Sequence, residues 1–165
     1  MFAASSSTPD YDDYHRVMLR HLGLDPTPQF LPDLGRDVPA TTILEICPDV
    51  METLQELKRR GVRMAVVSDA WPGLPDAHTA LGIGEFSEAY AISAVLAYRK
   101  PDPRMYHHAS AALDLAPAQC LFVDDDPSLV DAAIALGYVG RAVCRDSATA
   151  DVPSVVSLVE LLDLF

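Results

Sequence analysis

The sequence predicts an α/β domain, a Rossmann-like three-layer sandwich in which helices cover both faces of a mostly parallel sheet. Two observations lead to this fold class. Short apolar runs alternate along the chain with segments whose apolar residues recur at helical spacing. The run over 62–68 is apolar without interruption from Met64 to Val67, which is typical of a strand covered on both faces. A series of helix, strand, helix and strand requires crossover connections, and strands joined in this way run parallel.

An N-terminal helical part precedes the α/β body. The Thr-Pro pair at 8–9 is placed to cap and begin a helix, and Gly23 is placed to end it. The connection over 25–41 is rich in proline, which forbids a regular helix there. We therefore expect a boundary, with residues 1–41 as one part of the chain and residues 42–165 as the other.

The α/β body is expected to alternate helices and strands throughout. Glycines at 61, 82 and 137 stand where helices should end, because glycine readily takes the left-handed conformation. Prolines at 103 and 127 stand where helices should begin. The predicted helices cover 48–60, 75–81, 103–113, 127–136 and 153–162, and the predicted strands cover 62–68, 89–93, 120–123 and 138–144.

Charge and cysteine content limit the partners and the cellular compartment that we expect for this protein. The formal net charge is −12 and the basic residues are scattered, so neither nucleic acid nor an anionic membrane is an expected partner. The cysteines Cys47, Cys120 and Cys144 lack C-x-x-C spacing and are expected to be buried free thiols in a reducing cytosol. With neither a leader pattern nor a membrane-spanning run visible, we expect a cytoplasmic protein. The oligomeric state does not follow from the sequence.

Polar side chains follow the first two predicted strands. Ligands of parallel sheets bind at the carboxyl ends of strands, so these residues are candidates for chemistry. Ser68 and Asp69 end the first strand, where a hydroxyl and free backbone N–H groups can hold a phosphate oxygen, although a serine that caps a turn fits the pattern too. Lys100 follows the second strand in a segment stiffened by Pro101 and Pro103, and a fixed ammonium there can neutralise a phosphoryl group.

Three adjacent aspartates follow the third predicted strand. Asp126 is explained as a helix cap, with Pro127 as the first helical residue. Asp124 and Asp125 are not explained in this way, and adjacent carboxylates repel one another unless a cation lies between them. Carboxylate oxygens with room for waters and a phosphate suit Mg²⁺. The pair therefore predicts a magnesium site.

Taken in order, these segments resemble the haloacid dehalogenase superfamily of hydrolases, in the group whose cap is inserted early in the chain. MAVVSDA is similar to the family's second motif, YRKPDPRMY to its third and CLFVDDDPSLVDAAIALG to its fourth, within about residues 45–145. The resemblance implies that residues 1–41 are the remnant of a helical cap on the core over 42–165. It also implies phosphate binding by Ser68 and Asp69, and a catalytic Lys100 that steadies the phosphate and the nucleophile. By the same resemblance Asp125 would ligate Mg²⁺ and Asp124 would support the metal.

The family's first motif, an apolar strand ending in D-x-D, is not found. Its first aspartate attacks phosphorus to form an aspartyl-phosphate, and its second is the general acid and base. Asp10 and Asp12 have the spacing of the motif, but the serines and proline before them do not suit a buried strand. In the family this strand lies between those ending here at Ser68 and Val123, so its loss would expose two edges or force direct pairing. We therefore expect an N-terminally shortened version of a longer enzyme.

Two functions remain open. The first is a Mg²⁺-dependent phosphatase of a small phosphorylated metabolite by ancestry, inactive or impaired in this chain because the nucleophile is absent. The alternative is a non-catalytic module that uses the anion pocket to bind a ligand or a partner. Dehalogenation is less favoured than phosphatase chemistry, because paired carboxylates imply a metal that dehalogenation does not need.

Overall fold

The computed structural model describes residues 16, 19–25, 42, 44–146 and 151–165. The chain divides into two compact units, Met1–Val38 and Pro39–Phe165. In the first unit, residues 16 and 19–21 are helical and Gly23 follows them with a φ of +71°, so the predicted helix end is confirmed. The predicted helix start at 8–9 and most of the proline-rich connection lie outside the described residues. The assignment of residues 1–41 as a cap remnant stays a prediction.

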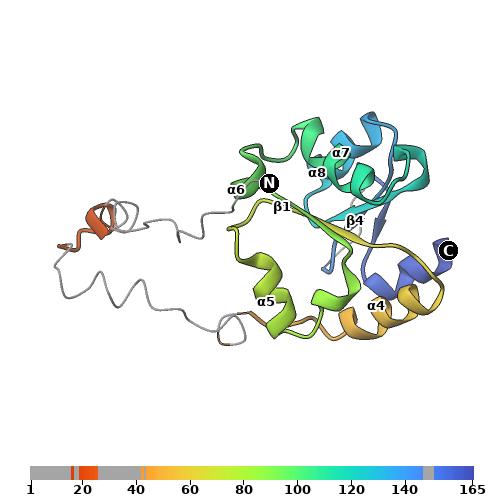
Figure 1. Cartoon of the computed structure of the whole chain (residues 1–165), viewed down its shortest axis with the longest axis horizontal. Coiled ribbons are helices and arrows are strands. Elements are labelled where there is room, and N and C mark those ends of the chain that lie inside the picture. The colour runs from red at the N-terminus through yellow and green to blue at the C-terminus, as the bar shows by residue number, and fades with distance from the viewer. Residues whose placement is uncertain (1–15, 17–18, 26–41, 43, 147–150) are drawn as a thin grey trace, which may run out of the picture. The chain divides into compact units, whose positions relative to one another are not determined.

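The second unit alternates helices and strands, as the sequence predicts. The helices α7 and α8 lie on one side of the strands, and α4 and α5 lie on the other (Figure 1). The expected α/β sandwich is therefore confirmed. The elements in order are α4 (Val50–Arg59), β1 (Ala65–Ser68), α5 (Leu74–Ala80), the 3₁₀ helix η1 (Gly84–Phe86), β2 (Ala89–Ile92), α6 (Ser93–Leu96), α7 (Pro103–Ala112), η2 (Pro117–Gln119), β3 (Leu121–Asp124), α8 (Pro127–Ala135), β4 (Val139–Val143), β5 (Ser154–Val155) and η3 (Leu158–Leu164).

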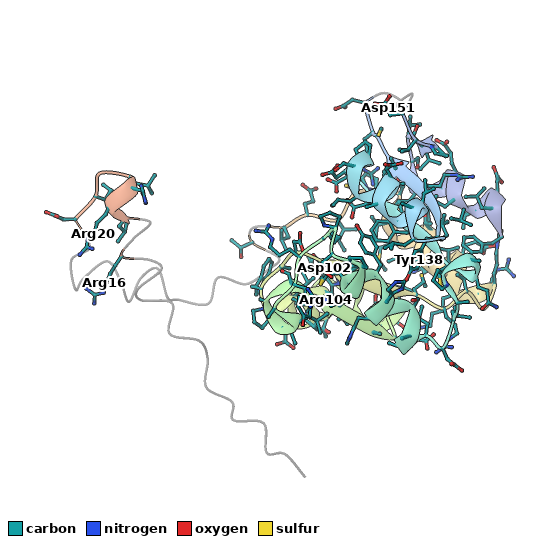
Figure 2. All side chains as sticks on the ribbon, turned by 90° about the horizontal axis from the view of Figure 1, so that it is seen from above. Arg16, Arg20, Asp102, Arg104, Tyr138 and Asp151 are labelled. Carbon is teal, nitrogen blue, oxygen red and sulfur yellow. The ribbon has the colours of Figure 1, made fainter. Side chains whose placement is uncertain are left out.

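The starts of α7 and α8 follow from local sequence. Each helix begins with a proline that is preceded by a capping aspartate. Asp102 accepts the backbone N–H of Arg104 at 3.0 Å, and Asp126 accepts that of Ser128 at 2.8 Å. The Arg104 guanidinium also donates to the Asp102 carboxylate, and the two side chains lie together in Figure 2. This arginine holds the pKa of Asp102 down at about 2.

The C-terminal segment differs from the sequence prediction. Instead of one helix over 153–162, the chain forms β5 and then η3. The reason is tertiary, because β4 offers an open edge to which Ser154 and Val155 add as a parallel strand. This pairing buries Val155, whose β-branched side chain suits a strand better than a helix. The short elements η1, α6 and η2 were not predicted, since three or four residues show no helical period.

In the described part of the chain, the strands form two separate parallel sheets rather than one. β1 pairs with β2, and β3 pairs with β4, which pairs in turn with β5. Every pair is parallel, as expected. Within the described residues β1 and β3 do not pair with one another, so each has an open edge. The sequence predicts that a sheet without the first-motif strand either leaves two strand edges unpaired or pairs those two strands directly. In the described residues the edges of β1 and β3 are unpaired.

The main core lies between the strands and the α7–α8 layer. Met105, Tyr106 and Val130 are fully buried, and the Tyr106 ring packs edge-on against Phe122 with centroids 4.9 Å apart. Burial, reinforced by the nearby negative charge of aspartates that include Asp124, raises the pKa of Tyr106 to about 12. The tyrosine is therefore neutral at physiological pH. Its hydroxyl donates to the Leu129 carbonyl at 3.2 Å, which ties α7 to the first turn of α8.

Two smaller sequence predictions can be compared with the structure. Cys47, Cys120 and Cys144 are free thiols, as expected. The expected burial is wrong, because Cys47 is exposed and Cys120 and Cys144 are only partly buried. Burial raises the pKa of the Cys120 thiol. In the described ranges, no helix combines the length and the apolar character that a membrane crossing requires.

Candidate active site

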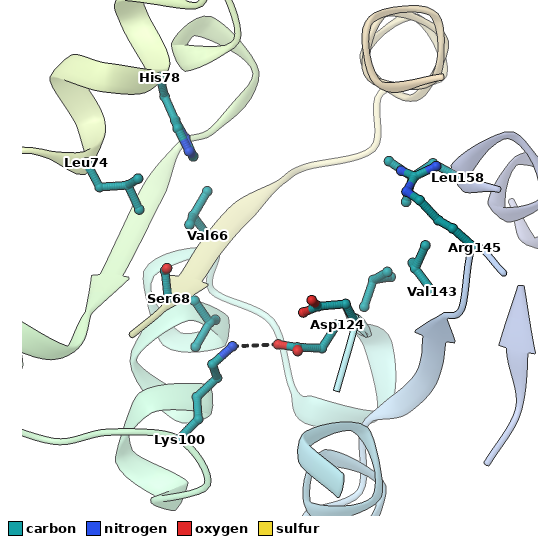
Figure 3. A pocket seen from close by; sticks show the side chains of 12 residues that line it. Val66, Ser68, Leu74, His78, Lys100, Asp124, Val143, Arg145 and Leu158 are labelled. Atoms are coloured by element: carbon teal, nitrogen blue, oxygen red, sulfur yellow. Dashed lines mark hydrogen bonds and ion pairs between the residues drawn. The ribbon is translucent and has the colours of Figure 1, made fainter. Parts of the chain in front are cut away.

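The carboxyl ends of β1 and β3 border one cavity of about 620 Å³ (Figure 3). Ser68 is the last residue of β1, Asp124 is the last residue of β3, and Asp125 follows it. Lys100 reaches the same cavity from the loop between α6 and α7. Four of the five predicted site residues are thus brought together, although they come from three segments far apart in the sequence. The carboxyl-end rule for parallel strands accounts for this convergence.

Lys100 and Asp124 form an ion pair within the cavity. The Lys100 ammonium is 2.5 Å from a carboxylate oxygen of Asp124, as the dashed line in Figure 3 marks. Their side chains are 10% and 8% exposed, so the pair is shielded from bulk water. The other Asp124 oxygen accepts the backbone N–H of Asp126 at 3.0 Å. Asp124 is therefore held rigidly, with both oxygens engaged.

The three consecutive aspartates have three different environments. Asp124 is the partner of Lys100, whereas Asp126 accepts both the hydroxyl and the backbone N–H of Ser128, which lowers the pKa of Asp126. Asp125 lines the cavity and is exposed, without a hydrogen bond or ion pair to any other residue of the described part. Of the three carboxylates, Asp125 is the one whose oxygens remain available to an incoming cation.

Asp69 is turned toward a neighbouring loop. One of its oxygens accepts the backbone N–H of Lys100 at 3.1 Å, and the other lies 3.7 Å from the Arg99 guanidinium. These contacts fix the loop that carries Lys100, and Asp69 does not line the cavity among the described residues. A carboxylate also repels a phosphate. The phosphate contact expected for Asp69 stays a prediction, and the observed geometry gives this residue a positioning role.

Two residues that the sequence reasoning missed also line the cavity, His78 and Arg145. His78 lies one helical turn after Leu74, which lines the cavity as well, and burial lowers the pKa of the His78 imidazole. Its Nδ1 is 3.3 Å from the Tyr90 hydroxyl. Arg145 follows the end of β4, so the same strand-end rule could have found it. No chemical motif marks His78, and only its spacing from Leu74 on a helix could have indicated it.

The donor set fits a magnesium ion that keeps most of its waters. Among the residues the structure describes, no three His, Cys, Asp or Glu side chains gather into a metal-binding group. Mg²⁺ is, however, usually held by one or two carboxylates together with waters and substrate phosphate. Asp125 supplies one available carboxylate, with Asp124 beside it. The cavity is thus suited to a shared site of metal and phosphate and not to a closed protein cage.

Comparison with known proteins identifies a family. The model of the haloacid dehalogenase-like hydrolase family matches residues 7–137. The chain is 36% identical over 120 residues to an (S)-2-haloacid dehalogenase of Pseudomonas sp. (strain YL), covering 70% of this chain and 49% of that protein. It is 31% identical to a phosphatase of Mycobacterium tuberculosis, covering 70% of this chain and 55% of that one. The chain therefore spans about half the length of these curated relatives.

Solved structures agree on the fold. A haloacid dehalogenase-type phosphatase from Thermococcus onnurineus superposes with a TM-score of 0.74 and 18% sequence identity, covering 94% of this chain and 73% of that one. At this level of identity the similarity concerns the fold alone. Dehalogenases and phosphatases both stand among the similar proteins, so the reaction has to be argued from the cavity itself.

Proposed function

We propose that this chain, which belongs to the haloacid dehalogenase-like hydrolase family, forms the phosphate- and magnesium-binding side of a phosphatase for a small phosphorylated metabolite. The observation that carries the proposal is the convergence of Ser68, Lys100, Asp124 and Asp125 on one cavity at the ends of β1 and β3. A hydroxyl and an ammonium in this set can bind an anion, and its carboxylates can bind a cation. A phosphomonoester together with Mg²⁺ supplies one anion and one cation.

Each residue has a distinct role in this proposal. The Ser68 hydroxyl donates to one phosphoryl oxygen. The Lys100 ammonium has three N–H donors, of which Asp124 engages one, and the others can point to the phosphoryl group. Asp125 ligates Mg²⁺, and Asp124 keeps Lys100 in place. When bound, Mg²⁺ would neutralise charge on the phosphoryl oxygens.

Hydrolysis through a covalent intermediate also needs an attacking carboxylate. One of its oxygens forms a bond to phosphorus while the ester oxygen leaves with a proton, and water then cleaves the acyl phosphate, releasing phosphate and restoring the carboxylate. The carboxylates among the described lining residues are Asp124 and Asp125, and the proposal assigns both to cations. We therefore expect these 165 residues to bind Mg²⁺ and phosphate without turning over an ester.

Titration calorimetry on the purified chain tests the binding site. Mg²⁺ is expected to bind more tightly in the presence of inorganic phosphate, and phosphate more tightly in the presence of Mg²⁺, because linkage is reciprocal. Asp125→Asn is expected to weaken Mg²⁺ binding about tenfold or more, since it removes the charged ligand. Asp126→Asn is the matched control, because the neighbouring carboxylate is engaged at the helix start and its loss should leave Mg²⁺ affinity nearly unchanged.

Two outcomes of these titrations, and one outcome of an activity assay, would redirect the assignment. Binding of neither Mg²⁺ nor phosphate to the folded chain would contradict the proposal. Phosphate binding that ignores Mg²⁺ and Asp125→Asn would favour the non-catalytic anion-binding module. Hydrolysis of p-nitrophenyl phosphate that is lost in Asp125→Asn would show that a carboxylate of this chain replaces the missing nucleophile.

Hydrolytic dehalogenation is the second candidate, favoured by the 36% identity to the Pseudomonas dehalogenase. The same cavity would then hold a carboxylate substrate through Ser68 and Lys100, without any need for a metal. Binding of 2-chloropropionate in the presence of a chelator, at equal strength in the parent and in Asp125→Asn, would support this candidate over the phosphatase. Asp125 favours the phosphatase, because its exposed carboxylate has no cationic partner among the described residues and dehalogenation would give it none.

A further inference from the structure

The cavity at the strand ends has a second basic residue, Arg145, on the side away from Lys100. Ser68 and Lys100 border one side of the cavity, and Arg145 lies with Val143 and Leu158 on the opposite side (Figure 3). The lining residues that the structure describes include one lysine and one arginine. The cavity therefore offers two separate positions to negatively charged groups, and the proposed function uses only the first.

The Arg145 guanidinium is held in place, but most of its donors are free. One of its nitrogens donates to the Asp49 carboxylate at 3.0 Å, and Asp49 is its single hydrogen-bond partner among the described residues. A guanidinium has five N–H donors, so the others remain available to a ligand. The Arg145 side chain is 41% exposed, whereas that of Asp49 is 13% exposed. The arginine is therefore anchored by a shielded carboxylate and stays accessible itself.

The ion pair with Asp49 does not account for all of Arg145. The same Asp49 oxygen also accepts two other hydrogen bonds, so the arginine supplies one of three donors to it. Arg104 is a useful contrast, because it too pairs with an aspartate at the start of a helix, Asp102. Arg104 spends two nitrogens on that carboxylate and is not among the described lining residues of the cavity. Arg145 spends one nitrogen and lines the cavity, which fits a second role as a ligand-binding residue.

The size and the walls of the cavity suit a short organic body with a charge at each end. The volume of about 620 Å³ lies within the range of about 300–1,000 Å³ that is typical of small-molecule sites, so there is room for more than a phosphate. The residues Val143 and Leu158 beside Arg145 are apolar, and apolar walls strengthen the attraction between a guanidinium and an anion. The net charge of −12 repels anions in general, so a second anionic group needs a cation close to it.

We propose that Arg145 binds a carboxylate of the substrate, so that the substrate class of this cavity is the phosphorylated carboxylic acids. The phosphoryl group lies beside Ser68 and Lys100, and the carboxylate accepts two N–H groups of Arg145, because the planar guanidinium matches a planar carboxylate. A carboxylate is preferred to a second phosphate, because a guanidinium shared with Asp49 compensates one charge better than two. The proposal rests on the proposed function, since it takes the phosphoryl position from there.

Phosphonates test this proposal on the intact chain, because their P–C bond imitates a phosphate ester and is not hydrolysed. The probes are phosphonoacetate, 3-phosphonopropionate and 4-phosphonobutyrate, each compared with the alkylphosphonate of the same chain length in titration calorimetry with Mg²⁺. At the best chain length the carboxylate should raise the affinity about tenfold or more. This gain should differ between chain lengths, because both charged ends must reach their cations at once.

Substitutions identify the partner of the carboxylate. Arg145→Met should remove the gain and leave the affinity for the alkylphosphonates nearly unchanged. Because this change leaves Asp49 without its cation, the double variant Arg145→Met with Asp49→Asn is the second test, in which neither charge is left alone. Arg145→Lys keeps the charge but not the planar fork and should retain part of the gain. Arg104→Met is the matched control, since Arg104 also pairs with an aspartate, and it should keep the whole gain.

Three results would overturn the proposal. One is equal binding of every phosphonocarboxylate and its alkylphosphonate, which would leave the proposed function standing and remove the carboxylate position. Another is a gain that persists in the folded double variant, because the carboxylate would then bind elsewhere. The third is tighter binding of propane-1,3-diphosphonate than of 4-phosphonobutyrate, which would assign a second phosphoryl group to Arg145. A gain that depends on Arg145 but on neither Mg²⁺ nor Asp125 would support the carboxylate position while contradicting the magnesium site of the proposed function.

Discussion

Lys100→Met is expected to lower the free energy of unfolding by about 3 kcal/mol. The variant leaves the Asp124 carboxylate, with a side chain only 8% exposed, without the cation that neutralises it. Breaking a buried ion pair costs about 3–5 kcal/mol. We expect the lower value for this pair, because the cavity beside it can admit water. Urea unfolding followed by circular dichroism measures the change, read from the midpoint at constant slope.

Lys58→Met is the matched control for that substitution. Lys58 pairs with Glu85 at 2.6 Å, but these side chains are 51% and 67% exposed, so the loss should stay within about 0.5 kcal/mol. The double variant Lys100→Met with Asp124→Asn should cost less than the sum of its single changes, because neither charge is then left alone. Equal effects of Lys100→Met and Lys58→Met would show that the Lys100 pair contributes no more than a surface pair.

Asp49→Ala is expected to lower the free energy of unfolding by about 2–4 kcal/mol. One oxygen of Asp49 accepts three hydrogen bonds, from the Arg145 guanidinium at 3.0 Å, the Ser157 hydroxyl at 2.9 Å and the Leu158 backbone N–H at 2.8 Å. These bonds tie the start of α4 to the start of η3. Asp49→Asn keeps an acceptor oxygen and should fall between the parent and Asp49→Ala in urea unfolding.

The Asp49 contribution should also depend on pH. The hydrogen bond from Arg145, together with those from Leu158 and Ser157, holds the pKa of Asp49 well below its usual range. A carboxyl group with a depressed pKa in the folded state stabilises at pH values above its unfolded pKa of about 4. That contribution is lost as the pH falls below about 4 toward the folded pKa. The stability difference between the parent and Asp49→Asn should therefore shrink between pH 5 and pH 3.

Other carboxyl groups affect the acid range as well. Hydrogen bonds from Arg59 and Arg60 lower the pKa of Glu56 to about 2, so the parent loses stability in acid for more than one reason. Subtracting the Asp49→Asn curve from the parent curve removes these shared contributions. A difference that stays constant from pH 7 to pH 3 would contradict the role given to the Asp49 charge.

Much of the site was predictable because its signals are local. Asp102 and Asp126 precede prolines, and a capped helix start depends on residues two positions apart. Ser68 was indicated because it ends a predicted strand, and Lys100, Asp124 and Asp125 because they follow one. Parallel strands bring their carboxyl ends to one edge of a sheet. The family resemblance assigned a role to each of these residues. Because the residues line one cavity, substitutions there can test those roles.

Tertiary structure decided what depends on contacts between distant segments. Asp124, Asp125 and Asp126 are the same residue type in three different environments. Asp124 pairs with Lys100, Asp125 is exposed and Asp126 caps α8, because their neighbours come from different parts of the chain. The segment after Pro153 became a strand only because β4 had an open edge to receive it.

The sequence alone determined the class of fold, the order of the longer helices and strands from α4 to β4, and the residues gathered at the strand ends, since these follow from periodicity, capping and the parallel direction of the strands. The gap between β1 and β3, the partners of Asp49 and the place of His78 in the cavity required the tertiary structure. Backbone pairing and side-chain burial are set by which surfaces meet in space, and one-dimensional patterns do not contain that information.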